Sequence, residues 1–293
     1  MTTPQDKTAN NGLILTGIDG SERSHSAAEY AIWISKNSQS PIKFLHTIEH
    51  SHKSEHAHHE GNLTPNIRRE LLSELSEEER QESKQLLTEG KAILNDVKSM
   101  AEQAGLTNII AKQRHGTLPE ALIDLESEIA MVVIGSKGED HGENKGLGSQ
   151  LEEAIRAINK PVFIVKKDFT EPKAMMFAYN GSPTSRKALE QLKLGTFCNK
   201  SINIHVVCVQ KNIADAEQLI ADAQEVLGDS NPNLVTQALV GDPIDELTRY
   251  QQEHDIDITS MGAFSHGKVH GFFFGSFTTR MLLESKTNFL LIR

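Results

Sequence analysis

A glycine-rich stretch that occurs twice at a fixed distance is the strongest constraint on this chain. The two copies are Gly135-Ser136-Lys137-Gly138, nine residues, Gly148-Ser149, and Gly262-Ala263-Phe264-Ser265, nine residues, Gly275-Ser276. Both glycine landmarks are displaced by 127 residues (262 − 135 and 275 − 148). Each copy is followed by a helical pattern and a short apolar run, which predicts a duplicated strand–loop–helix–strand unit.

The rest of the chain fits two copies of one α/β domain. Apolar runs predict strands at 13–18, 42–48, 108–112, 131–134 and 162–165 in the first half, with helical patterns between them. Runs at 175–179, 204–209 and 288–292 repeat the first, second and last of these. Strands that alternate with helices predict parallel sheets in doubly wound domains. We therefore expect a disordered tail at 1–11, a first domain at 12–168 and a second at 173–293.

The first copy is longer than the second because of a polar insert. The offset between matching landmarks falls from 162 (208 − 46) to 127, which places about 35 extra residues (162 − 127) at 49–82. We expect an acidic helical run there, followed by a helical pattern at 84–104. The insert also contains five histidines, a residue type that suits zinc, nickel or copper: His50, His52, His56, His58 and His59. Because nothing fixes a ligand geometry, a solvated loop is the preferred interpretation and a metal site the alternative.

Composition limits the partners of this chain. Its net charge is −10, which argues against non-specific binding to nucleic acid or to an acidic membrane surface. Its two cysteines, Cys198 and Cys208, form no disulfide framework or zinc spacing, which indicates a reducing compartment. No leader pattern and no apolar run of about 18 residues is present. We expect a cytoplasmic protein with no nucleic-acid or membrane partner.

These motifs together resemble the universal stress protein family. The resemblance rests on four features: Asp19-Gly20-Ser21 after the first strand, His46 near the end of the second, Gly116 with Pro119, and the loop from Gly135 to Ser149. That loop is similar to the family's ATP-binding signature, G-x2-G-x9-G-S/T. The resemblance covers both halves and implies a tandem member. It also implies five parallel strands per domain in the order 3-2-1-4-5, flanked by helices, with the domains packed as a pseudo-dimer through their last strands.

The same resemblance implies an adenine-nucleotide site in the first domain. In the order 3-2-1-4-5 the topological switch lies between the first and fourth strands, where ligands bind. Asp19 and Gly135 should therefore face one crevice. Ser149, with Glu152, is expected to form a capping box at a helix N-terminus that favours phosphate. The alternative for Asp19 is a plain helix cap. The implied contacts to ATP or AMP, with or without Mg²⁺, are Asp19, Thr47, Gly135, Lys137, Gly138, Gly148, Ser149 and Gln150.

The second copy departs from this pattern, so a weaker site is expected there. Asn180 replaces the aspartate, which removes a charge. Ser265 replaces the middle glycine, and a non-glycine residue resists a backbone with φ > 0. The corresponding positions are Asn180, Val209, Gly262, Ser265, Gly275 and Ser276.

No catalytic constellation stands out in the sequence. A phosphate-binding Walker loop is missing, because Gly90-Lys91 and Gly267-Lys268 are followed by neither serine nor threonine. No Ser-His-Asp order or Cys-His pair lies at matched positions. We expect a stress-response regulator that binds nucleotide with little or no turnover and acts on an unknown protein partner. The alternatives are a nucleotide-free interaction module, a slow ATPase or an adenylyl-transferring ligase. A homodimer of the whole chain is also left open.

Overall fold

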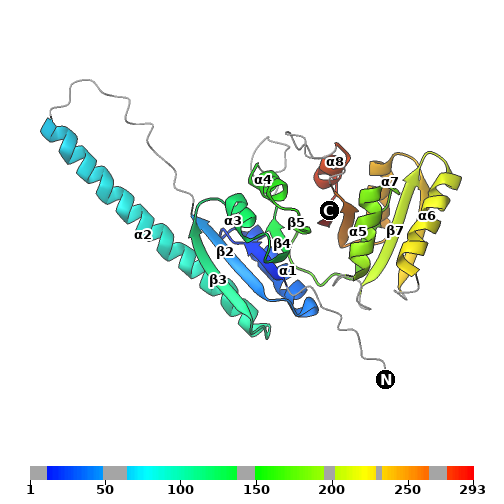
Figure 1. Ribbon diagram of the computed structural model, residues 1–293, viewed down its shortest axis with the longest axis horizontal. Helices are drawn as coiled ribbons and strands as arrows, with labels where there is room; N and C mark the ends of the chain where they lie inside the picture. The colour runs from blue at the N-terminus through cyan, green and yellow to red at the C-terminus, as the bar shows by residue number, and fades with distance from the viewer. Residues whose placement is uncertain (1–11, 49–64, 137–148, 195–201, 229–232, 264–275) are drawn as a thin grey trace.

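The two halves of the chain share one continuous sheet. The structure, a computed structural model, describes residues 12–48, 65–136, 149–194, 202–228, 233–263 and 276–293. Within them the sheet has ten strands in the order β3-β2-β1-β4-β5-β10-β9-β6-β7-β8 (Figure 1). Each half therefore has the order 3-2-1-4-5 in its own numbering. This confirms two tandem doubly wound domains. The predicted tail at 1–11 lies outside the described residues.

The bounds of the described elements follow the predicted alternation of strands and helices. The strands are β1 (Leu13–Gly17), β2 (Ile42–Ile48), β3 (Ile109–His115), β4 (Ile129–Gly135), β5 (Val162–Val165), β6 (Ala174–Ala178), β7 (Asn203–Gln210), β8 (Leu234–Val240), β9 (Ile258–Gly262) and β10 (Asn288–Ile292). The helices are α1 (Glu22–Ser38), α2 (Pro65–Gln103), α3 (Leu118–Leu125), α4 (Ser149–Ala157), α5 (Pro183–Leu194), α6 (Ile213–Leu227), α7 (Pro243–Glu253) and α8 (Ser276–Glu284).

Helices cover both faces of this sheet, which explains why its central strands read as apolar runs. One apolar cluster packs α1, α2, α5 and α6 on one face, and a second packs α3, α4, α7 and α8 on the other. Each cluster contains residues of both halves. The central strands β5 and β10 are buried at every position. The hydrophobic core is thus shared between the domains rather than divided between them.

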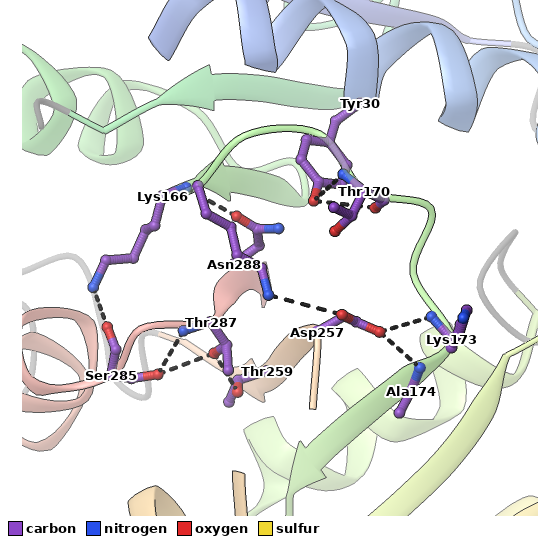
Figure 2. A network of polar contacts seen from close by, with 11 residues as sticks. Tyr30, Lys166, Thr170, Lys173, Ala174, Asp257, Thr259, Ser285, Thr287 and Asn288 are labelled. Atoms are coloured by element: carbon purple, nitrogen blue, oxygen red, sulfur yellow. Dashed lines mark hydrogen bonds and ion pairs between the residues drawn. The ribbon is translucent and has the colours of Figure 1, made fainter. Parts of the chain in front are cut away.

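The domains join through their last strands. β5 and β10 pair antiparallel, with Phe163 opposite Leu290 at the centre of the register. All other strand pairs in the described sheet are parallel. The predicted pseudo-dimer is therefore confirmed. Figure 2 shows the connecting segment beside this junction, where the Tyr30 hydroxyl donates to the Thr170 carbonyl at 3.3 Å.

Two cations cross the domain boundary in a reciprocal arrangement. Lys166 and Arg293 follow the last strands of their domains and are 127 residues apart (293 − 166). Lys166 Nζ donates to the Leu282 carbonyl of α8 at 2.6 Å and to that of Ser285 (Figure 2), while Arg293 donates to the Ile155 carbonyl of α4. Each cation thereby satisfies carbonyls at the C-terminal end of the other domain's last helix and complements its dipole.

The helical part of the insert is continuous with the helix that follows it. The expected acidic run and the expected helix at 84–104 form one 39-residue helix, α2, whereas its counterpart α6 has 15 residues. At 1.5 Å per residue α2 is about 60 Å long, and Figure 1 shows its N-terminal half reaching beyond the sheet. The physical reason is that 66–89 contains neither glycine nor proline and is rich in Glu, Leu, Gln and Arg. The five histidines lie outside the described residues.

Candidate functional site

The predicted nucleoside contact, Asp19, lies in a tight turn at the C-terminal end of β1. Its Oδ1 accepts a hydrogen bond from the Ser21 backbone N–H at 2.9 Å. Gly20 supplies the turn with φ +85°. Ser21 caps α1, because its Oγ accepts from the Ser24 N–H at 3.1 Å. Asp19 is therefore not the helix cap that was the alternative interpretation, and it is exposed just beyond the C-terminal end of β1.

The carboxyl group of Asp19 is ionised at neutral pH. Loss of hydration next to the protein raises its pKa even though the residue is exposed, but the hydrogen bonds from Ser21 and Ser24 outweigh this and hold the pKa below the ordinary 3.8. An ionised carboxylate only accepts hydrogen bonds, and it repels phosphate. Asp19 therefore suits the hydroxyls or the amine of a nucleoside rather than a phosphate chain.

Gly135 lies at the C-terminal end of β4, the parallel neighbour of β1. Asp19 and Gly135 thus occupy the ends of adjacent strands at the topological switch, as predicted. A Cβ on Gly135 would lie 2.6 Å from the Arg23 carbonyl oxygen, so this glycine lets the first turn of α1 approach β4. Gly262 does the same for α5, with 3.0 Å to the Thr184 carbonyl oxygen. In both domains close helix packing accounts for the glycine, whether or not a ligand binds.

The remaining predicted contacts are described only in part. Thr47 is partly exposed in β2, opposite Arg114 of β3, one residue before the strand ends. Ser149 and Gln150 form the start of α4, and only their backbone is described. The predicted capping box depends on the Ser149 side chain and so lies outside the described part. Glu152 accepts from Arg156 Nη2 at 3.0 Å. Lys137, Gly138 and Gly148 lie outside the described residues.

The second domain reproduces the turn without the charge. Asn180 Oδ1 accepts from the Ser182 N–H at 3.1 Å, and Ser182 Oγ accepts from the Ser185 N–H at 3.2 Å. Val209 is buried in β7, Gly262 ends β9, and Ser276 begins α8. The first turn of α8 has no acidic residue, in contrast to Glu152 of α4. Ser265 and Gly275 lie outside the described residues.

Sequence reasoning missed one residue of this region, Arg23. It lies in the first turn of α1, and its Cγ is 3.0 Å from the Cβ position of Gly135. Its Nη1 donates to Asp168 Oδ1, in the connecting segment, at 3.2 Å. The only available signal was its place in Asp19-Gly20-Ser21-Glu22-Arg23-Ser24, directly after the predicted nucleoside contact.

Metal-binding clusters, membrane-spanning helices and cavities are the other features of the described structure that bear on function. Among the described residues no group of three or more His, Cys, Asp or Glu side chains could hold a metal ion. No helix in this part of the chain combines the length and the apolar composition of a membrane-spanning segment. A cavity of about 240 Å³ lies away from Asp19, beside the connecting segment and the ends of α7 and α8. It is lined by a mixture of charges, among them Lys167, Asp255, Asp257, Glu284 and Lys286.

Comparisons with known proteins agree with this architecture. The sequence profile of the universal stress protein family matches residues 11–166 and 206–293. A universal stress protein of Synechocystis sp. is 28% identical over 285 residues, which are 96% of this chain and 99% of that protein. The crystal structure of a universal stress protein from Archaeoglobus fulgidus has a TM-score of 0.71 at 19% identity, covering 98% of this chain and 99% of that one.

A second crystal structure has the same fold at greater distance. A functionally unknown protein from Pseudomonas aeruginosa has a TM-score of 0.57 at 14% identity, covering 96% of this chain and 92% of that one. The match of the family profile to both halves decides the assignment. The chain belongs to the universal stress protein family, as a tandem member with two such domains in one polypeptide.

Proposed function

We propose that the first domain binds an adenine nucleotide, ATP or AMP, in the crevice between β1 and β4, and that the bound state is its output. One observation carries the proposal. The ionised Asp19 and the glycine that opens the loop, Gly135, lie at the C-terminal ends of adjacent parallel strands. In addition, α4 starts at Ser149, directly after the loop. Crevices of this kind are the usual ligand sites of open parallel sheets.

The residues divide into a nucleoside end and a phosphate end. Asp19 and the backbone of Thr47 take the nucleoside, because a carboxylate and a strand end offer hydrogen-bond acceptors. The backbone of Gly135, Gly138, Gly148, Ser149 and Gln150, with the Lys137 ammonium, takes the phosphates. Unpaired N–H groups and the positive dipole end of α4 favour an anion there. A Mg²⁺ ion, when present, is held by the phosphates.

The second domain binds nucleotide weakly or not at all. Its turn is the same as in the first domain, but Asn180 lacks the charge of Asp19. Ser265 stands where the first loop has Gly138. A non-glycine residue forced into a strained backbone costs about 1–3 kcal/mol, which is roughly a ten- to hundredfold loss of affinity.

Turnover of the bound nucleotide is slow or absent. Asp19, a carboxylate at the crevice, has a lowered pKa and accepts a hydrogen bond from its own turn, which makes it a weak general base. Analysis of the products after long incubation with ATP tests this. Hydrolysis at about 1 per second or faster, an ordinary enzymatic rate, would show that the protein is an ATPase.

The binding itself is tested by thermal unfolding with ATP, AMP, adenosine or no ligand, and by the mass of any ligand retained on purification. A nucleotide that binds the native state raises the midpoint with concentration. No shift with any of them would favour the nucleotide-free interaction module. We further place the protein in the cytoplasm, from its cysteine content, and expect a protein partner that distinguishes the loaded from the empty form.

A further inference from the structure

We propose that Arg23 is a phosphate-binding residue of this site and that it exchanges Asp168 for the nucleotide. The inference rests on the proposed function and adds a contact that the glycine signature does not contain. It also links the site to the segment that joins the two domains, because Asp168 lies between β5 and β6.

Arg23 is placed beside the phosphate end of the crevice. It lies in the first turn of α1, four residues after Asp19. Its carbonyl oxygen and its Cγ lie 2.6 Å and 3.0 Å from the Cβ position of Gly135, the residue that opens the glycine loop. The side chain therefore starts at the C-terminal end of β4. Its guanidinium reaches Asp168, three residues beyond Val165, and Val165 pairs with Gly135 in the sheet.

The guanidinium of Arg23 is incompletely paired. Nη1 donates to Asp168 at 3.2 Å, but Nε is buried and has no hydrogen-bond partner among the described residues. A buried donor without an acceptor is unfavourable, and it is more so on a cation. Arginine presents its N–H groups in a planar fork that matches the oxygens of a phosphate. A nucleotide phosphate is the group that would satisfy this fork.

The present partner of Arg23 is weakly held. The side chain of Asp168 is 89% exposed, whereas that of Arg23 is 23% exposed. Exposed ion pairs contribute little, because water screens them and both side chains lose freedom. A phosphate at the crevice would therefore compete well with Asp168. The exchange breaks one contact of the segment that connects β5 and β6. Two other hydrogen bonds, of Tyr30 with Thr170 and of Lys173 with Asp257, still join this segment to both domains (Figure 2).

This contact belongs to the first domain alone. The corresponding position in the second domain is Thr184 (23 + 161), which carries no charge. The turn residues Asp19 and Asn180 are related by the same offset. Arg23 is thus a second source, besides the glycines, of the difference in affinity between the two domains.

The test is calorimetric titration of the full chain with ATP and with adenosine. Arg23→Gln should weaken ATP binding about tenfold, which is about 1.4 kcal/mol, and leave adenosine binding unchanged. Asp168→Asn should strengthen ATP binding, since it removes the competitor. The double variant should bind ATP as Arg23→Gln does. Arg280→Gln, which removes an arginine paired to a carboxylate in the second domain, is the matched control and should bind ATP like the wild type.

The outcomes separate this inference from the proposed function. A wild type that binds no ATP contradicts both. If Arg23→Gln binds ATP as tightly as the wild type does, the role of Arg23 is overturned, whereas the nucleotide site itself is not. An equal loss of ATP and adenosine binding in Arg23→Gln would show a structural effect, and it would also overturn the phosphate contact. Unchanged or weaker ATP binding in Asp168→Asn would overturn the exchange.

Discussion

At the scale of single residues, Asp19 and Asn180 are a natural comparison. They make the same turn, with the side-chain oxygen 2.9 Å and 3.1 Å from a serine N–H. Asp19→Asn should therefore keep the free energy of unfolding within about 0.5 kcal/mol of the wild type at pH 7. It should weaken adenosine and ATP binding alike, since the nucleoside end is affected. Chemical denaturation measures the free energy of unfolding, and calorimetric titration measures the two affinities. An unchanged affinity for adenosine would show that Asp19 is not part of the site.

Gly135 and Gly262 predict a stability effect that is independent of ligand. A Cβ would lie 2.6 Å from the Arg23 carbonyl oxygen at Gly135 and 2.9 Å from Ser185 Cα at Gly262. Overpacking of this kind costs about 1–3 kcal/mol. Gly135→Ala and Gly262→Ala should both lower the denaturation midpoint without ATP. If only Gly135→Ala were destabilising, the packing account of these glycines would be wrong.

These residues show what sequence reasoning could and could not reach. The Asp-Gly-Ser motif and the spacing of the loop were enough to place Asp19 and Gly135 at neighbouring strand ends. They were not enough to distinguish a glycine that makes room for a ligand from one that makes room for a neighbouring helix, because both roles require a residue without a Cβ atom. Arg23 was missed because its pairing with Asp168 joins residues 145 positions apart.

At the scale of elements, the packing of α2 depends on one glycine. A Cβ on Gly90 would lie 2.2 Å from Gln113 Nε2 and 2.4 Å from His46 Cδ2. Alanine is ordinarily more favourable than glycine within a helix by about 1 kcal/mol. Here we expect Gly90→Ala to lower the free energy of unfolding, because the side chain would push α2 away from β2 and β3. Chemical denaturation of this variant, with a substitution at the exposed Thr88, Thr88→Ala, as control, measures the sign of the change in the free energy of unfolding. A stabilised Gly90→Ala would contradict this packing.

Most strands could be predicted, whereas the extent of α2 could not. A strand buried on both faces is an apolar run with clear ends, and β2, β5 and β10 begin and end where predicted. The charged first half of α2 has no apolar run to mark it, and the strand landmarks assign it to an insert. Its continuity with the second half rests on helix propensity along an uninterrupted segment, a weaker signal.

At the scale of the whole molecule, the shared core predicts cooperative unfolding. The sheet is continuous, both apolar clusters contain residues of both domains, and Lys166 and Arg293 each bond to the opposite domain. Calorimetry should show one transition, with equal calorimetric and van't Hoff enthalpies. ATP should move that transition as a whole. Two separated transitions, with only one shifted by ATP, would show that the domains unfold independently.

The pairing of the domains was predictable only through the duplicated pattern. An apolar last strand in each half indicated a sheet edge that must be paired or covered. The family resemblance then implied that the two last strands pair with each other. The reciprocal bonds of Lys166 and Arg293 were missed, although both residues and their acceptors, Ile155 and Leu282, obey the offset of 127 (293 − 166 and 282 − 155). A sequence does not reveal such contacts until the arrangement of its two domains is known.

The central claim is that one nucleotide binds per chain, in the first domain. Calorimetric titration with ATP measures this stoichiometry directly, in the wild type, in Gly138→Val, and in Ser265→Val as the matched variant of the second loop. We predict one ATP per chain in the wild type and in Ser265→Val, and no binding in Gly138→Val. Two equal sites, or unchanged binding in Gly138→Val, would contradict the account.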